Sequence, residues 1–182
     1  MALRWPRRRL SVPEPLARAL DPDEQVQVIA PLADGDLLAV TRFGMWLLSG
    51  DVAVRWNWEL VSKARLAAGE LGVLVAQEVA RTDDDIAVLQ DLAPRQFRLV
   101  GPSGLTDVVH TRVRRSVAAS RYLPWPDGGG WVVLRRVPGR NGLTVQIRLD
   151  EGVDATVDGL LSGGFLDAVR QVAEQLTDDV KS

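Results

Sequence analysis

The chain has 182 residues, of which 46% are hydrophobic, and it carries a formal net charge of −2. This size suits one domain, or one domain with a substantial extension, and the apolar fraction is sufficient for a buried core. The absence of cysteine excludes disulfides, thiol catalysis and cysteine metal sites, and it indicates a reducing compartment, so we expect a cytoplasmic protein. No run of about 18 apolar residues occurs, and therefore no membrane-spanning helix is expected.

The chain begins with a basic segment, and we expect residues 1–21 to form an arm that ends in one short helical turn at residues 13–20. Arg7, Arg8 and Arg9 resemble the start of a twin-arginine export signal. The residues that follow are rich in proline and acidic groups, and they contain no apolar stretch of the kind that such a signal needs. We therefore reject export.

From residue 25 onward, short apolar segments alternate with tight polar turns. Asp34-Gly35 and Ser49-Gly50 are typical hairpin turns, because glycine adopts the positive φ that such turns require. The corner from Trp56 to Val61 interrupts the series, and the acidic residues 83–85 form a further turn. The pattern predicts a meander of short antiparallel strands, with segments at residues 26–30, 37–41, 45–48, 52–56, 63–68, 72–79, 86–89 and 96–100.

A helix is expected after the strands, over residues 103–120. Its apolar residues Leu105, Val109, Val113 and Val117 recur on one face of a helix, and the prolines from residue 124 onward end it. A hairpin of strands 131–137 and 143–149 follows, with Asn141-Gly142 in its turn. Residues 143–149 alternate apolar and polar, which predicts a half-exposed strand. A second amphipathic helix begins near residue 165, because the preceding glycines disfavour a helix.

The predicted fold class is α+β: a mainly antiparallel β barrel or sandwich, partly open, capped by the helix at its C-terminal end. A ββα extension packs on this unit. The predicted divisions are a basic arm at 1–21, the barrel with its helix at 22–123, and the extension at 124–182, together one compact unit. If strand 143–149 forms a sheet edge, it offers a surface through which two copies pair as a homodimer.

Two segments carry a resemblance to a known family. The hairpin made by Leu37-Leu38-Ala39-Val40-Thr41-Arg42 and Met45-Trp46-Leu47-Leu48, and the following Val54-Arg55-Trp56-Asn57-Trp58-Glu59-Leu60-Val61, resemble pleckstrin-homology-like domains, including bacterial and GRAM-type relatives. The likeness covers roughly residues 22–120. The chain also resembles a set of actinobacterial proteins that continue with a strand pair and a helix. The resemblance implies binding of phosphoinositides, peptides or proteins. The acidic first hairpin loop, with Asp34 and Asp36, argues against lipid head groups at the usual site.

Residues with catalytic or ligand-binding chemistry are scarce. His110 is the only histidine, and we expect it to be a partly exposed residue of the predicted helix. Asp83, Asp84 and Asp85 are adjacent and lack the spacing of a calcium loop. The glycines at 128–130 precede a strand, whereas a phosphate loop precedes a helix. We therefore predict no catalytic residue, no cofactor and no metal site.

The best binding candidate is basic. Residues 101–148 carry eight basic and two acidic side chains, whereas residues 149–182 carry two basic and eight acidic ones. On a helix, Arg112, Arg115 and Arg121 would lie beside the apolar stripe. The sequence leaves two alternatives open, an anionic partner or pairing with Asp150, Glu151, Asp154 or Asp158. The candidate binding surface comprises Arg112, Arg115, Arg121, Arg135, Trp56 and Trp58.

The leading hypothesis is a non-catalytic module that binds an unknown protein or peptide at a sheet edge or along the basic helix. The alternative is peripheral binding to an anionic lipid surface through the arginines. We rank an enzyme lower, since catalytic groups are few. Nucleic acid also ranks lower, because the total charge is negative and lysine is nearly absent.

Overall fold

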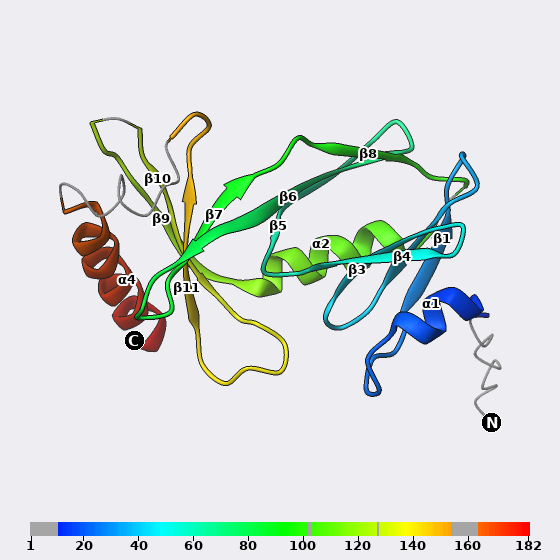
Figure 1. The fold of residues 1–182 in the computed structure, drawn as a ribbon, viewed down its shortest axis with the longest axis horizontal. Helices are drawn as coiled ribbons and strands as arrows, with labels where there is room; N and C mark the ends of the chain where they lie inside the picture. Colours follow the sequence, from blue (N-terminus) through cyan, green and yellow to red (C-terminus); the bar gives the residue numbers. More distant parts are fainter. Residues whose placement is uncertain (1–10, 102, 127, 154–163) are drawn as a thin grey trace, which may run out of the picture.

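In a computed structural model, the structure describes residues 11–101, 103–126, 128–153 and 164–182. Figure 1 shows an elongated molecule with a four-stranded sheet at one end and the C-terminal helix at the other. The class is α+β, with curled sheets that form a half-barrel. Among the described helices, none is long and apolar enough to cross a membrane.

The first sheet is an antiparallel meander in the order β1-β2-β3-β4. Gly35, at φ 94°, provides its first turn, as the Asp-Gly pair predicts. A short helix, α1 (Glu14–Ala19), buries Leu16 against one face of this sheet. The strands are β1 (Val28–Pro31), β2 (Leu37–Val40), β3 (Gly44–Ser49) and β4 (Val52–Asn57).

The second sheet has seven strands, in the order β5-β6-β7-β11-β10-β9, and β8 pairs with the first half of the long β6. Every pairing in it is antiparallel except β7 with β11, which is parallel. The segment after residue 124 therefore continues the sheet begun by the earlier strands. The strands are β5 (Val61–Ala67), β6 (Glu70–Arg81), β7 (Ala87–Asp91), β8 (Arg95–Arg98), β9 (Val117–Leu123), β10 (Gly130–Arg135) and β11 (Thr144–Leu149).

Two helices complete the two main hydrophobic cores. Helix α2 (Leu105–Ser116) inserts Leu105 and Val109 between the first sheet and the strands β5, β6 and β8. Helix α4 (Phe165–Lys181) covers one face of β9, β10 and β11, and buries its own Val169 and Leu176 there (Figure 1). The expected α1 turn and the start of the terminal helix at Phe165 are confirmed.

Three expectations about the second half of the chain are wrong. The helix predicted over residues 103–120 ends at Ser116, and residues 117–123 form strand β9, which pairs with β10. Val117 fits the helical stripe, but Val117, Ala119 and Arg121 also alternate along a strand, and pairing with β10 decides between them. Strand β11 lies between β7 and β10, so it is not a sheet edge and cannot pair edge to edge with a second copy. Nor is β11 half exposed, because Gln146 and Arg148 are buried.

Candidate functional site

The two tryptophans of the predicted binding surface lie in the core beneath α2. Trp56 contacts Phe97, with ring centroids 6.0 Å apart, and the Arg95 guanidinium lies 5.0 Å from the Trp56 ring. Trp58 is 1% exposed, and its Nε1 donates a hydrogen bond to the carbonyl of Thr41 at 3.1 Å. Both side chains therefore stabilise the corner between the two sheets, and only Trp58 also reaches the wall of a surface pocket.

Arg121 is separated from the other predicted arginines because it lies on β9, not on α2. Its guanidinium donates to Gln175 and Asp179 of α4. This contact pairs a basic side chain with an acidic one of the C-terminal segment, but its partner, Asp179, is not one of the carboxylates that the sequence analysis named. Asp150 accepts hydrogen bonds from Tyr122 and Gly129 instead, and residues 154 and 158 lie outside the described residues.

Arg135 belongs to a buried polar layer between the seven-stranded sheet and the corner that precedes β5. It is 2% exposed, and it donates from Nη1 to Ser116 Oγ at 2.6 Å and from Nη2 to the carbonyl of Val61 at 3.3 Å. Burial, and the positive charge of Arg148, lower the pKa of Arg135 to about 9. Arg135 is therefore part of the interior rather than an exposed binding residue.

Arg148 on β11 is the second buried guanidinium of this layer, and its pKa is lowered chiefly by burial. It pairs with Asp91 at 3.0 Å and donates to the carbonyl of Glu59 at 2.9 Å and to Ser62. The Nε atoms of Arg135 and Arg148 have no hydrogen-bond partner among the described protein atoms. The layer thus joins strands that are far apart in the sequence, through charged groups with unused donors.

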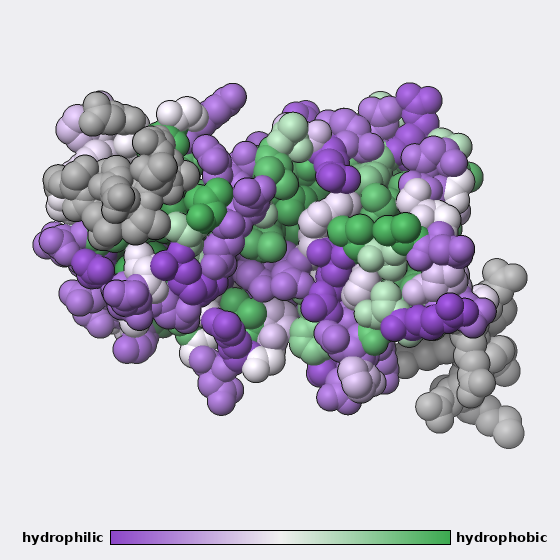
Figure 2. Space-filling model, viewed as in Figure 1, coloured by the Kyte–Doolittle hydropathy of each residue, from purple (hydrophilic) through white to green (hydrophobic). Residues whose placement is uncertain are grey.

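A cleft of about 870 Å³ lies over this layer, between β5–β7 on one side and β9–β11 on the other. Figure 2 shows hydrophobic residues at the surface near the middle of the molecule. Trp131 on β10 is 49% exposed, and its ring centroid lies 5.6 Å from that of Tyr122. The apolar lining residues are Leu74, Leu92, Ala93, Pro94, Val117, Trp131, Val133 and Leu149.

A second, smaller pocket of about 170 Å³ collects four arginines, and we call it the arginine pocket. Two of them are the predicted Arg112 and Arg115, which project from one side of α2. Arg42 comes from the turn between β2 and β3, and Arg136 directly follows β10. Burial, and the charge of Arg115, lower the pKa of Arg112. The lining is completed by Trp58, Ser116, Val137 and Pro138.

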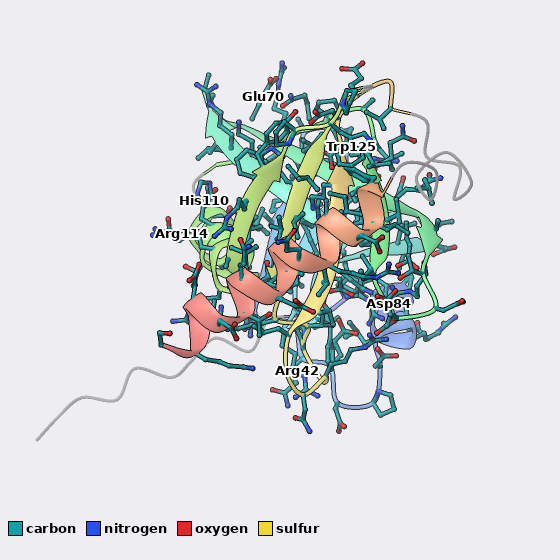
Figure 3. The ribbon with its side chains drawn as sticks, turned by 90° about the vertical axis from the view of Figure 1, so that its left-hand side faces the viewer. Arg42, Glu70, Asp84, His110, Arg114 and Trp125 are labelled. Atoms are coloured by element: carbon teal, nitrogen blue, oxygen red, sulfur yellow. The ribbon has the colours of Figure 1, made fainter. Side chains whose placement is uncertain are left out.

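The other residues considered for catalysis, metal binding or phosphate binding lie outside the two pockets described above. His110 is exposed on α2, and Figure 3 shows it on the same side of the molecule as Arg114. Asp84 pairs with Arg170 and accepts from Thr82, and these hydrogen bonds lower its pKa to about 2. Gly130 begins β10. In the described ranges no three side chains of His, Asp or Glu gather as a metal site would require.

Sequence reasoning located Arg112 and Arg115 but did not find the complete arginine pocket. Arg42 lies 70 residues before Arg112, and no local pattern connects the two. Arg148 was expected on the exposed side of its strand, because strict alternation is typical of a half-solvated strand. The face of β11 that carries it is covered by the chain from Glu59 to Ser62, which a single-strand pattern does not reveal.

Comparison with protein-family models, with curated proteins and with solved structures finds no significant match.

Proposed function

We propose that this protein is a non-catalytic interaction module that binds an extended peptide segment of a partner protein along β9, with an apolar side chain of that segment in the cleft. The observation that carries this proposal is the position of β9. It is the last strand of the seven-stranded sheet, and its residues Val117 and Ser120 also line the cleft.

A sheet edge presents N–H and C=O groups to which an added strand can hydrogen bond. In the described chain β9 pairs only with β10. Proline and lysine, which protect many edge strands, do not occur within β9, and Arg121 is directed to α4 by its hydrogen bonds. The irregularity in its pairing with β10 is confined to residues 117–119, at the start of the strand. Ser120 and Tyr122 are exposed beside this edge. The strand therefore supports pairing with a peptide.

The cleft supports the second half of the proposal. Trp131 and Leu92, from opposite sides of the cleft, are each more than two-fifths exposed. Half-exposed apolar side chains at the mouth of a concave site provide the contacts that an anchoring side chain of a peptide needs. A peptide paired with β9 would place alternate side chains on the cleft face of the sheet, because side chains alternate along a strand.

The scaffold is consistent with a pleckstrin-homology-like domain, and we propose this assignment for residues 22–123. Its support is the arrangement of a four-stranded meander, a second set of strands and a following helix, α2, that packs between them. Such domains bind partners without catalysis. We also propose a cytoplasmic location, which the absence of cysteine supports.

Selection from a random peptide display library, with the purified protein as bait, tests the function. We expect enriched peptides to share an apolar anchor. Their affinity should fall at least about tenfold in Trp131→Ser and Leu92→Asp, since a buried apolar side chain contributes about 1.5–3 kcal/mol. Val180→Asp is the matched control, because Val180 is an exposed apolar residue on α4, outside the cleft.

Pairing of the peptide backbone with β9 can be tested separately, by nuclear magnetic resonance and hydrogen exchange. Binding of an enriched peptide should shift the amide resonances of residues 117–123 and slow their hydrogen exchange. Equal affinity of the cleft variants and Val180→Asp, or amide changes confined to other strands, would count against the proposed function.

A further inference from the structure

We propose that the arginine pocket is a binding site for a phosphate group, either on a small molecule or in a lipid headgroup. The site is separate from the cleft. It lies where the turn after β2, the last turns of α2 and the segment after β10 meet. Figure 3 shows Arg42 beside the end of the hairpin between β10 and β11, in agreement with the shared lining of Arg42 and Pro138.

The positive charge of this pocket is not offset by the described side chains. Its four arginines are accompanied only by Trp58, Ser116, Val137 and Pro138, and no carboxylate is among the described lining residues. Over the described ranges, none of the four arginines forms an ion pair. Arginines elsewhere do so readily: Arg55 pairs with Asp21 and Glu24. Four like charges at one small pocket repel one another, and a bound anion would relieve this repulsion.

Contacts within the protein orient two of the guanidinium groups and leave most of their N–H donors free. The Arg42 guanidinium lies 4.3 Å from the centroid of the Phe43 ring, a cation–π contact that leaves its N–H donors free. Arg136 donates one hydrogen bond, from Nη1 to the carbonyl of Val117 at 3.2 Å. Since a guanidinium has five N–H donors, Arg136 retains most of its capacity. The pocket is thus partly organised before a ligand arrives.

The number of donors favours phosphate over carboxylate. A carboxylate has one charge and two oxygens, and one bidentate arginine can satisfy most of its acceptor capacity. A phosphate monoester has a charge between about −1.5 and −2 at neutral pH and three acceptor oxygens. Four arginines that approach from three segments of the chain can therefore be used together only by the larger, more highly charged group.

One arginine of the pocket also has a structural role in its helix. Arg115 lies in the last turn of α2, where a positive charge stabilises the helix through its dipole. Arg114 lies in the same turn but does not line the pocket. It is therefore the matched control, because its removal changes the helix charge equally and leaves the site intact.

Calorimetric titration with phenyl phosphate, compared with benzoate, tests the proposal. We expect phenyl phosphate to bind in preference to benzoate, and the affinity to decrease as pH falls through the second ionisation of phosphate, at about 6. The double variant Arg112→Gln/Arg115→Gln should bind at least about tenfold more weakly. Arg114→Gln should stay within about twofold of the unchanged protein. Equal loss in both variants, or no saturable binding of phenyl phosphate, would overturn the proposal.

If the double glutamine variant does not fold, as circular dichroism would reveal, Arg112→Lys/Arg115→Lys replaces it. Lysine keeps the charge but lacks the bidentate fork, so affinity should still fall, and unchanged affinity would overturn the proposal. Co-sedimentation with phosphatidic acid vesicles distinguishes the two sources of the phosphate. If the unchanged protein sediments with the vesicles and the double variant does not, the site binds a lipid headgroup. If the unchanged protein binds phenyl phosphate but does not sediment with the vesicles, the site binds a soluble phosphate.

Discussion

The guanidinium of Arg148 lies 3.0 Å from a carboxylate oxygen of Asp91, and this pair joins β11 to the end of β7. Arg148 is 7% exposed, while the Asp91 side chain is partly solvated. Ser62 also donates to Asp91 at 2.6 Å, so the carboxylate connects β5 to the same layer. Breaking the pair would leave a buried positive charge with only neutral acceptors.

We therefore expect Asp91→Ala to lower the free energy of unfolding by about 1.5–3 kcal/mol, the usual contribution of a hydrogen bond to a charged group. Urea denaturation monitored by tryptophan fluorescence measures the change. Asp51→Ala is the control, since Asp51 lies exposed in the turn between β3 and β4. Equal stability of the two variants would mean that the pair does not stabilise the sheet.

Glu24 is a buried carboxylate that organises the first sheet. It accepts hydrogen bonds from Trp46 Nε1 and Arg55 Nη1, both at 2.9 Å, and from the hydroxyl of Thr41. Glu24→Ala leaves Trp46 Nε1 without an acceptor, whereas Arg55 keeps Asp21 and Thr41 keeps the carbonyl of Gly44. We therefore expect a loss of about 1–3 kcal/mol, the usual cost of an unsatisfied buried polar group. Asp23→Ala, at the exposed neighbouring position, should change the unfolding free energy by less than about 0.5 kcal/mol. Thermal denaturation of both variants provides the comparison.

Asp84 connects the turn between β6 and β7 to α4 through Arg170. Because hydrogen bonds from Arg170 and Thr82 lower its folded pKa to about 2, below the ordinary 3.8, the folded state favours the ionised form. The resulting stability is present above about pH 4 and is lost as pH falls to about 2. The side chain is half solvated, so the contribution is below about 1 kcal/mol.

The difference in melting temperature between the unchanged protein and Asp84→Asn should accordingly be small at neutral pH and vanish near pH 2. Direct titration of the Asp84 carboxyl carbon by nuclear magnetic resonance checks the cause. A midpoint near the ordinary value would contradict the pairing with Arg170.

Gly44 at the start of β3 allows close approach of β4. A Cβ at this position would lie 2.4 Å from the carbonyl oxygen of Trp56, so a side chain requires the two strands to separate. We expect Gly44→Ala to destabilise by about 1–3 kcal/mol, as overpacking usually does. Gly104→Ala is the control, because no atom lies within 4 Å of its Cβ position. Equal melting temperatures of the two variants would show that the strands adjust freely.

Local patterns in the sequence were sufficient for the elements whose partners are close along the chain. The Asp34-Gly35 turn predicted the first hairpin, because glycine readily adopts the positive φ that a tight turn between two strands requires. The terminal helix was equally readable from Phe165, Val169 and Leu176, which recur on one helix face. Both signals depend on backbone geometry over fewer than about a dozen residues.

The arrangement of the second sheet was decided only by tertiary structure. Residues 117–123 suit a helix or a strand, and hydrogen bonds to β10 select the strand. The parallel pairing of β7 with β11 joins segments nearly 60 residues apart. The chain from Glu59 to Ser62 covers Arg148, although the alternating pattern of its strand had indicated an exposed side chain. Likewise, Arg42 and Arg112 share a pocket only because α2 packs across the first sheet. Periodicity identifies an element and its apolar face, whereas the neighbour that covers each face depends on contacts between distant segments.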